Sequence, residues 1–351
     1  MFLSELYKAL RKKEILILLV LGIAFDVFMS SKNSVILPQG VNRNVFREYI
    51  AKVAGEYTDE KKDFIISERD KYQSYTEQWG EYEEKYRSGE IEPEEYSDFM
   101  HNFKEAERKL DTLEYLVSKS LYYEELSKIS GYVMYFDDID VDDYVGNMGI
   151  ELALVLLLTV IIVNLFGEDF ACGTHYMVIT SENGRGRLYR ARLKCLMIIS
   201  ILSGVLFPAV EWGTKAHHYD LGNMDADIRC LSSMKGSGLN MNIGEYLLLC
   251  VVVRTVAAVF YSIIVMAVTL LVRNTISDYV ISVALLFLPN IIYEQLGKYL
   301  KVSALCRGFA VYQGYGTGLK VAGIHGMVIW SILYGMLSAV LTVMMYRRLN
   351  E

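Results

Sequence analysis

Three ionisable residues fall within or at the end of apolar stretches of the sequence: Arg254, Glu211 and Asp26. Burying an ionisable group in lipid costs free energy, so such residues are usually paired or functional. We predict that Arg254 pairs with Glu211 or with Asp26. These residues either form a structural ion pair, or extend a long side chain to the headgroups, or line a polar route through a membrane. The structural interpretation is favoured.

An acidic run, 133–147, carries five aspartates. Carboxylate oxygens are the ligands that hard cations such as Ca²⁺ take. The run lacks the glycine and the closing glutamate of an EF-hand loop, so we interpret it as a solvated acidic linker. His217, His218 and Asp220 could also suggest a metal, but adjacent histidines are equally typical of a plain polar loop. The sequence therefore predicts no metal site.

Signatures of catalysis are absent from the sequence. It contains no GxxxxGK(S/T) phosphate loop, no GxSxG and no HExxH. The five cysteines are an odd number, scattered and without a CxxC pair, so they indicate neither a disulfide framework nor a zinc site. We therefore predict that the chain is not itself an enzyme and holds no cofactor. An intramembrane enzyme is the least favoured class.

The composition points to a membrane protein. Of 351 residues, 53% are hydrophobic, and the mean hydropathy is +0.24, a value that soluble domains of this size rarely reach. A membrane span needs about 20 mostly apolar residues. Six runs approach that length: 15–31, 149–167, 195–213, 246–272, 279–297 and 322–346.

Three helix-breaking residues interrupt two of these runs: Pro289 in the fifth, and Gly204 and Pro208 in the third. Spans tolerate such residues where neighbouring helices satisfy the freed backbone groups. The first run could instead be the core of a signal peptide. It offers no small-x-small cleavage site and contains Asp26, so we interpret it as an uncleaved span.

Basic residues in short loops collect on the cytoplasmic side of a membrane. With the N-terminus inside, the inner segments 1–14, 167–194, 273–278 and 346–351 together carry 12 Lys and Arg. The short outer loops, 213–245 and 298–321, carry 7. This bias predicts a multi-pass protein of the cell membrane with both termini in the cytoplasm, ending in a tail at 347–351.

Residues 32–148 remain as one large extracytoplasmic domain with a net charge of −12, which argues against binding to nucleic acid or anionic lipid. Two aromatic and apolar series repeat in it at 3-4 spacing, the pattern of a coiled-coil seam. Gly89 can end the first helix and Pro93 can open the second. A hairpin of two long antiparallel helices is predicted, with the rings as its core rather than a ligand platform. The series are Tyr72, Tyr75, Trp79, Tyr82 and Tyr86, then Tyr96, Phe99, Phe103, Ala106, Leu110, Leu113 and Val117.

The segment 167–194 between the second and third apolar runs resembles one family. Its Glu168, followed by Gly173-Thr174 and a basic stretch entering the next span, is similar to the corresponding loop in the membrane subunit of type-2 ABC transporters. The amphipathic segment 1–14 resembles that family's interfacial elbow helix. A proline common before the arginines is replaced by "SENGRGR". The basic positions are Arg185, Arg187, Arg190, Arg192 and Lys194.

The resemblance implies an all-α integral membrane protein of six transmembrane helices, 15–31 and five more within 149–346, with the helical-hairpin insert between spans 1 and 2. It implies that a separate ATPase subunit docks on a coupling helix in 167–194, near Glu168, Gly173, Thr174, Arg185, Arg187 and Lys194. It also implies a second membrane subunit, identical or related, in the lipid bilayer. The expected function is export of a peptide, lipid or drug-like substrate. The alternative is a membrane receptor or sensor whose external coiled coil is the reader and which has no ATPase partner.

Overall fold

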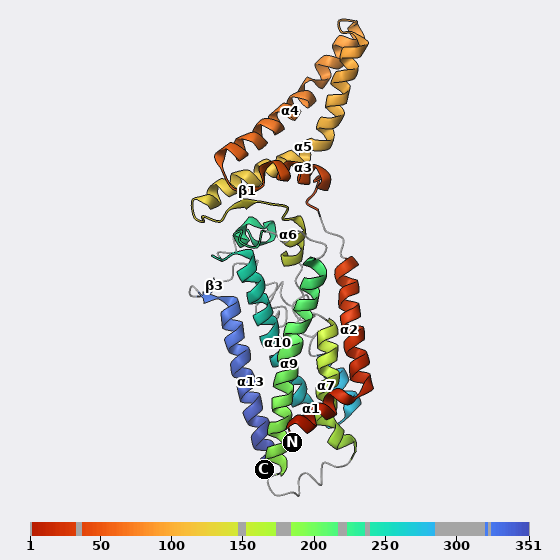
Figure 1. Ribbon diagram of the computed structural model, residues 1–351, viewed down its shortest axis with the longest axis vertical. Helices are drawn as coiled ribbons and strands as arrows, with labels where there is room; N and C mark the ends of the chain where they lie inside the picture. The colour runs from red at the N-terminus through yellow and green to blue at the C-terminus, as the bar shows by residue number, and fades with distance from the viewer. Residues whose placement is uncertain are drawn as a thin grey trace, which may run out of the picture. The chain divides into compact units, whose positions relative to one another are not determined.

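The computed structural model describes residues 2–32, 37–146, 152–172, 184–216, 223–235, 239–284, 320–321 and 324–350. The described chain is mostly helical and divides into two compact units (Figure 1). The helical unit comprises Met1–Asn33, Asn147–Tyr219 and Tyr246–Glu351. The hairpin unit comprises Ser34–Gly146 and Asp220–Glu245, so its second segment comes from between the third and fourth apolar runs.

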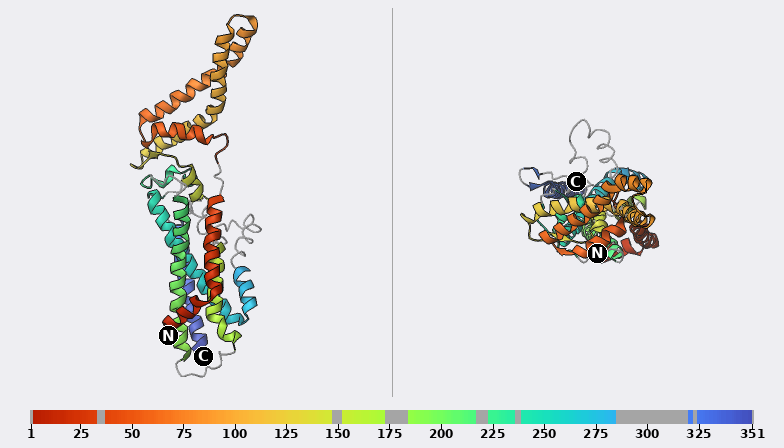
Figure 2. Two further views of the ribbon diagram at one scale, coloured as in Figure 1. Left: turned by 45° about the vertical axis from the view of Figure 1, so that its right-hand side comes forward. Right: turned by 90° about the horizontal axis from the view of Figure 1, so that it is seen from above.

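The helical unit is a bundle of long apolar helices. The helices α2 (Lys13–Lys32), α7 (Leu152–Ala171) and α9 (Gly184–Ala216) lie side by side and pack against one another (Figure 2). A two-stranded antiparallel sheet, β3 (Lys320–Val321) with β4 (Ile324–His325), precedes the last helix. The elements are α1 (Phe2–Arg11), α2 (Lys13–Lys32), α7 (Leu152–Ala171), α9 (Gly184–Ala216), α10 (Ile243–Val272), a helix over Thr275–Ala284, β3 (Lys320–Val321), β4 (Ile324–His325) and α13 (Gly326–Asn350).

Two of the described helices are long and apolar enough to cross a membrane: Gly186–Thr214, within α9, and Ile243–Val272, which is α10. Shorter apolar helices cover Ala153–Glu168, Thr275–Ala284 and Gly335–Arg347. The predicted span at 279–297 lies outside the described residues from position 285 onward.

The breakers Gly204 and Pro208 do not end α9, which continues through both. Gly204 instead permits a close approach to α10. A Cβ atom added there would lie 2.8 Å from the backbone Cα of Thr255, nearer than real Cβ atoms come. Glycine, which has no Cβ, is therefore required at this crossing; small residues are common at interfaces between membrane helices.

The hairpin unit is built on two long antiparallel helices, α4 (Asp59–Ser88) and α5 (Pro93–Ser127), as the periodicity predicts (Figure 1). Gly89 caps α4 with a φ of +78°, a left-handed conformation that favours glycine. Pro93 occupies the first turn of α5. The remaining elements are α3 (Arg43–Val53), β1 (Gly55–Glu56), β2 (Met134–Tyr135), α6 (Ile139–Gly146) and the 3₁₀ turns η1 (Ile228–Cys230) and η2 (Ser232–Met234), with β1 antiparallel to β2.

The predicted aromatic seam of the hairpin is confirmed. Ring centroids lie 4.0 Å apart in the stacked pairs Tyr82–Phe99 and Tyr86–Tyr96. Trp79 stacks on Phe103 at 4.6 Å. Aromatic pairs add about 0.5–1.5 kcal/mol each beyond the buried area. The rings therefore hold α4 against α5 as a core.

The interpretation of 133–147 as a solvated linker is wrong. Asp138 and Asp140 are buried. Asp138 forms an ion pair with Lys119 of α5, and Asp140 accepts from Arg43 of α3 at 2.5 Å. Buried carboxylates require such partners, and the basic residues that supply them lie far away in the sequence. These aspartates join α6 to α3 and α5.

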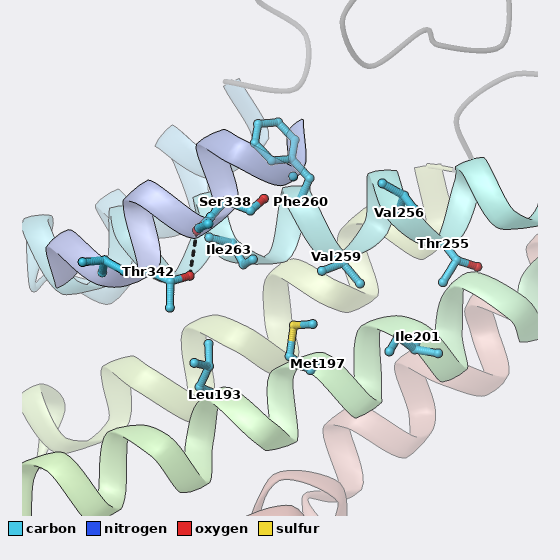
Figure 3. A pocket seen from close by; sticks show the side chains of 13 residues that line it. Leu193, Met197, Ile201, Thr255, Val256, Val259, Phe260, Ile263, Ser338 and Thr342 are labelled. Atoms are coloured by element: carbon cyan, nitrogen blue, oxygen red, sulfur yellow. Dashed lines mark hydrogen bonds between the residues drawn. The ribbon is translucent and has the colours of Figure 1, made fainter. Parts of the chain in front are cut away.

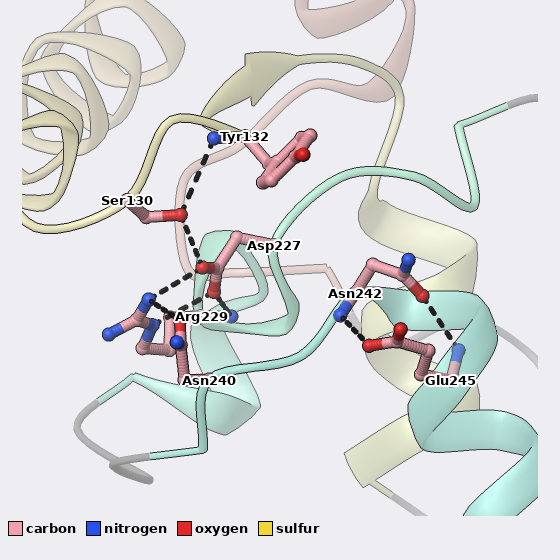
Figure 4. A network of polar contacts seen from close by, with 7 residues as sticks. All are labelled: Ser130, Tyr132, Asp227, Arg229, Asn240, Asn242 and Glu245. Carbon is pink, nitrogen blue, oxygen red and sulfur yellow. Dashed lines mark hydrogen bonds and ion pairs between the residues drawn. The ribbon is translucent and has the colours of Figure 1, made fainter.

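The segment 223–245 completes the hairpin unit through Asp227, which is buried (Figure 4). Its carboxylate accepts from the guanidinium of Arg229 at 2.6 and 2.9 Å and from the hydroxyl of Ser130 at 2.6 Å. Its backbone N–H donates to the carbonyl of Tyr132 at 2.9 Å. Tyr123 of α5 donates its hydroxyl to the carbonyl of Cys230 at 3.2 Å. The sequence prediction of an outer loop over 213–245 does not anticipate these contacts.

Replacing Asp227 by asparagine should destabilise the hairpin unit at pH 7 by about 2–3 kcal/mol, the scale of hydrogen bonds to a charged group. Burial works against ionisation of Asp227, but the hydrogen bonds from Arg229 and Ser130 outweigh it and hold the pKa of the carboxyl below its ordinary value. This contribution is present above about pH 4, where an unfolded aspartate is ionised, and is lost as the pH falls through the lower folded pKa. Thermal unfolding at pH 7 and in stronger acid should show the gap between wild type and variant closing. A gap that is constant with pH would contradict the role of the charge.

Candidate coupling site in the helical unit

The amphipathic helix α1 is attached to α9 by a salt bridge. Glu5 accepts from the guanidinium of Arg192 at 2.9 Å, and both side chains are largely buried. Leu6 of α1 packs on the hydrophobic core of the unit. Leu3 and Tyr7, which lie across the helix from Glu5, are exposed over 74% and 63% of their surface. Helix α1 thus turns Glu5 to the bundle and leaves an apolar surface open, typical of a helix at a membrane interface.

The junction between α1 and α2 is attached to α7. Lys12 lies between the two helices, and its ammonium is 3.4 Å from the carboxylate of Glu168 and 3.3 Å from the amide oxygen of Asn164. Glu168 and Asn164 are one turn apart near the end of α7, so they face the same way. The predicted coupling residue Glu168 is therefore held in place by a residue of the predicted elbow segment.

The predicted loop 167–194 is largely helical where it is described, because α7 runs to Ala171 and α9 begins at Gly184. Arg, Leu, Ala and Lys favour helix, and no breaker follows Gly186 until Gly204. Gly173 and Thr174 lie outside the described residues, and Arg185 is described only as part of the α9 backbone.

The basic residues at the start of α9 have two different surroundings. Arg187, Arg190 and Lys194 are exposed, and their i, i+3, i+7 spacing places them on one face. Arg192 is buried against Glu5, so it anchors α1 and is not available to a partner. The exposed stripe can bind headgroups or the acidic groups of another protein.

Tyr189 is a site residue that sequence reasoning misses. Its hydroxyl donates to the carbonyl of Thr342 at 3.3 Å, and its ring lies 5.9 Å from that of Tyr346. These contacts attach α9 to α13, the last helix. An aromatic residue among the basic residues of this stretch is the only signal in the sequence for them. Helices α1 and α13 thus both contact the first part of α9, through Arg192 and Tyr189.

Arg254 pairs with Glu211, one of its two predicted partners. Arg254 of α10 donates to the carboxylate of Glu211 of α9 at 2.6 Å, and the two side chains are 5% and 11% exposed. Asp26 lies in α2, and its side chain is outside the described part of the chain. The pair lies close to the crossing at Gly204, since Arg254 is adjacent to Thr255.

An open pocket of about 740 Å³ lies among α9, α10 and α13 (Figure 3). Its volume is within the range of small-molecule sites. No charged side chain lines it, and the hydroxyls of Thr255 and Thr342 donate to carbonyls of their own helices at 2.8 Å. The lining is Leu193, Met197, Ile201, Thr255, Val256, Val259, Phe260, Ile263, Gly335, Ser338, Ala339, Thr342 and Val343.

Comparisons of the whole chain with protein-family models, curated proteins and solved structures find no match.

Proposed function

We propose that this chain is the membrane-spanning subunit of an ATP-driven exporter, with six spans and both termini in the cytoplasm. A separate ATPase subunit would dock on the segment 167–194, and a second membrane subunit would complete the transporter. The observation that carries the proposal is the double attachment of the elbow segment: Glu5 to Arg192 on α9, and Lys12 to Glu168 on α7.

These two attachments lie on either side of the segment 173–183. A force applied to that segment by a partner would therefore reach α7, α9 and the α1–α2 junction together. Packed helices joined by hydrogen bonds and ion pairs respond as nearly rigid bodies. The exposed basic stripe of Arg187, Arg190 and Lys194 supports docking as well, because it can meet acidic groups on the partner.

The pocket among α9, α10 and α13 supports a substrate with an apolar part. Its uncharged lining would leave the charge of an ionic substrate unpaired. Peptides with apolar side chains, lipids and drug-like molecules fit this chemistry.

The test is purification of the full chain in mild detergent from its own host, with Glu168→Gln and the exposed Glu84→Gln of α4 as matched carboxylate-to-amide variants. We expect an ATPase to copurify with wild type and with Glu84→Gln. Losing one charged contact costs about 1.5–3 kcal/mol, so binding to Glu168→Gln should fall about tenfold or more. Stability should change little, because the Lys12–Glu168 pair is partly exposed.

The alternative, a receptor or sensor without an ATPase, is favoured by the hairpin. A 30-residue and a 35-residue helix with a continuous aromatic seam form a long rod suited to contact another molecule. If the wild-type chain copurifies with no ATPase, the receptor replaces the exporter as the proposed function. Equal ATPase recovery with Glu168→Gln would overturn the docking role of that residue alone.

A further inference from the structure

Asp278 carries a buried carboxyl group that has no hydrogen-bond partner. It lies in the helix Thr275–Ala284 and is 1% exposed. Both carboxyl oxygens are buried, and neither has a hydrogen-bond partner in the structure as described. Its backbone N–H donates to the carbonyl of Asn274 at 2.9 Å, a hydrogen bond that closes the helical turn leading to Asp278. The residue falls in the predicted inner segment 273–278, before the predicted fifth span.

The neighbours of Asp278 on α7 and α10 offer few polar groups that could form a hydrogen bond with its carboxyl. A Cβ atom added to Gly167 of α7 would lie 4.0 Å from the carboxyl and 3.3 Å from the methyl of Thr269 on α10, so the three elements pack closely. Thr269 donates its hydroxyl to the carbonyl of Val265 at 2.9 Å. One turn beyond Asp278, Ser282 also has a buried hydroxyl without a partner among the described residues. Two unsatisfied groups therefore share one face of this helix.

The ionisable groups on the neighbouring elements do not offset a charge on Asp278. On α7, Glu168 is paired with Lys12. On its own helix, Tyr279 carries a neutral phenol, whose oxygen accepts from the amide of Asn164 at 3.5 Å. Tyr261 of α10 donates to the carbonyl of Ser282 at 3.3 Å. Arg273, which follows α10, is exposed. Burial is the single cause that raises the pKa of Asp278, to about 6.

We propose that Asp278 is a proton-binding site. The carboxylate takes one proton to become the neutral acid while the helix Thr275–Ala284 packs on α7 and α10, and opening of this packing, which lets water reach the carboxyl, favours release of the proton. An ionised carboxylate left buried without a partner costs far more than neutralising it. The attraction of a helix N-terminus for a negative charge is worth only about 0.3–1 kcal/mol, too little to reverse this. Proton binding and opening are then linked reciprocally.

The experiment is infrared spectroscopy of the full-length protein in detergent, titrated with pH. We expect a protonated-carboxyl C=O band that disappears with a midpoint well above the ordinary aspartate value of about 3.9. The band should shift when aspartate carboxyls are labelled with ¹³C and should be absent from Asp278→Asn. The labelled wild type makes the test independent of whether the variant folds. A wild-type spectrum in which no aspartate band titrates above that ordinary value would overturn the proposal.

Thermal stability gives a second measurement. The folded state holds a proton that the unfolded chain releases, so wild-type stability should fall as the pH rises from about 4 towards about 6. Asp278→Asn should remove this fall, whereas the exposed Asp63→Asn should keep it. The same pH profile in all three proteins would count against the site. Neither measurement involves an ATPase, so failure here leaves the proposed exporter function untouched.

Discussion

Replacing Lys119 by methionine is expected to destabilise the hairpin unit by about 3–5 kcal/mol, the cost of removing one partner of a buried ion pair. Lys119 and Asp138 are paired and both buried. The rings of Phe46, Tyr123 and Tyr115 lie 5.5, 5.7 and 5.9 Å from the ammonium. Methionine keeps the packing against these rings but leaves the carboxylate of Asp138 without its counter-charge.

Hydrogen exchange of the full-length protein measures this loss of stability separately for each helix and strand. Amides of β2 and of the second half of α5 should exchange at least about 100-fold faster, since each 1.4 kcal/mol corresponds to a factor of ten. The control is Lys85→Met, which breaks an exposed pair with Glu81 at 2.6 Å and should cost about 0.5 kcal/mol or less. The double variant Lys119→Met/Asp138→Leu should recover most of the stability. A loss no greater than that of Lys85→Met would show that the buried pair is not a major stabiliser.

The hairpin could be predicted from the sequence because its determinants are local. The 3-4 repeat from Tyr72 to Tyr86 specifies a helical stripe, and Gly89 and Pro93 specify where one helix ends and the next begins. Each signal lies within a few residues of the structure that it specifies. The stacked rings then follow from two such stripes joined by a short turn.

The contacts of the candidate site could not be predicted in this way. Glu5 and Arg192 are 187 residues apart, and neither lies in a pattern that distinguishes it from its charged neighbours. Asp227 and Ser130 are 97 residues apart, and the segment around Asp227 has no helical or strand periodicity. A charge in a polar stretch looks solvated until the fold brings a partner to it, as Asp138 and Asp140 also show.

Replacing Glu211 by leucine is expected to be the most damaging single change in the helical unit, at about 3–5 kcal/mol. The variant leaves the guanidinium of Arg254 buried without the carboxylate 2.6 Å away. Water has little room to hydrate this guanidinium, because α9 and α10 approach so closely at Gly204 that no Cβ atom fits against Thr255. The fraction of protein that stays monodisperse after heating in mild detergent should fall sharply. Glu211→Gln, which keeps an acceptor for the guanidinium, should lie between leucine and wild type.

The double variant Glu211→Leu/Arg254→Met distinguishes a structural pair from one that lines a polar route. Removing both charges leaves neither residue of the pair without the other, so thermal stability should return close to that of wild type. If the pair is structural, this stable protein without the two charges will keep the proposed ATPase coupling and export. If the pair lines a polar route, the same protein will be stable but inactive, because the charges that a substrate meets have gone. We expect the first result, since both side chains are buried between α9 and α10 and neither lines the pocket among α9, α10 and α13. A double variant as unstable as Glu211→Leu alone would show that the cost lies in packing at this position and not in the lost charge.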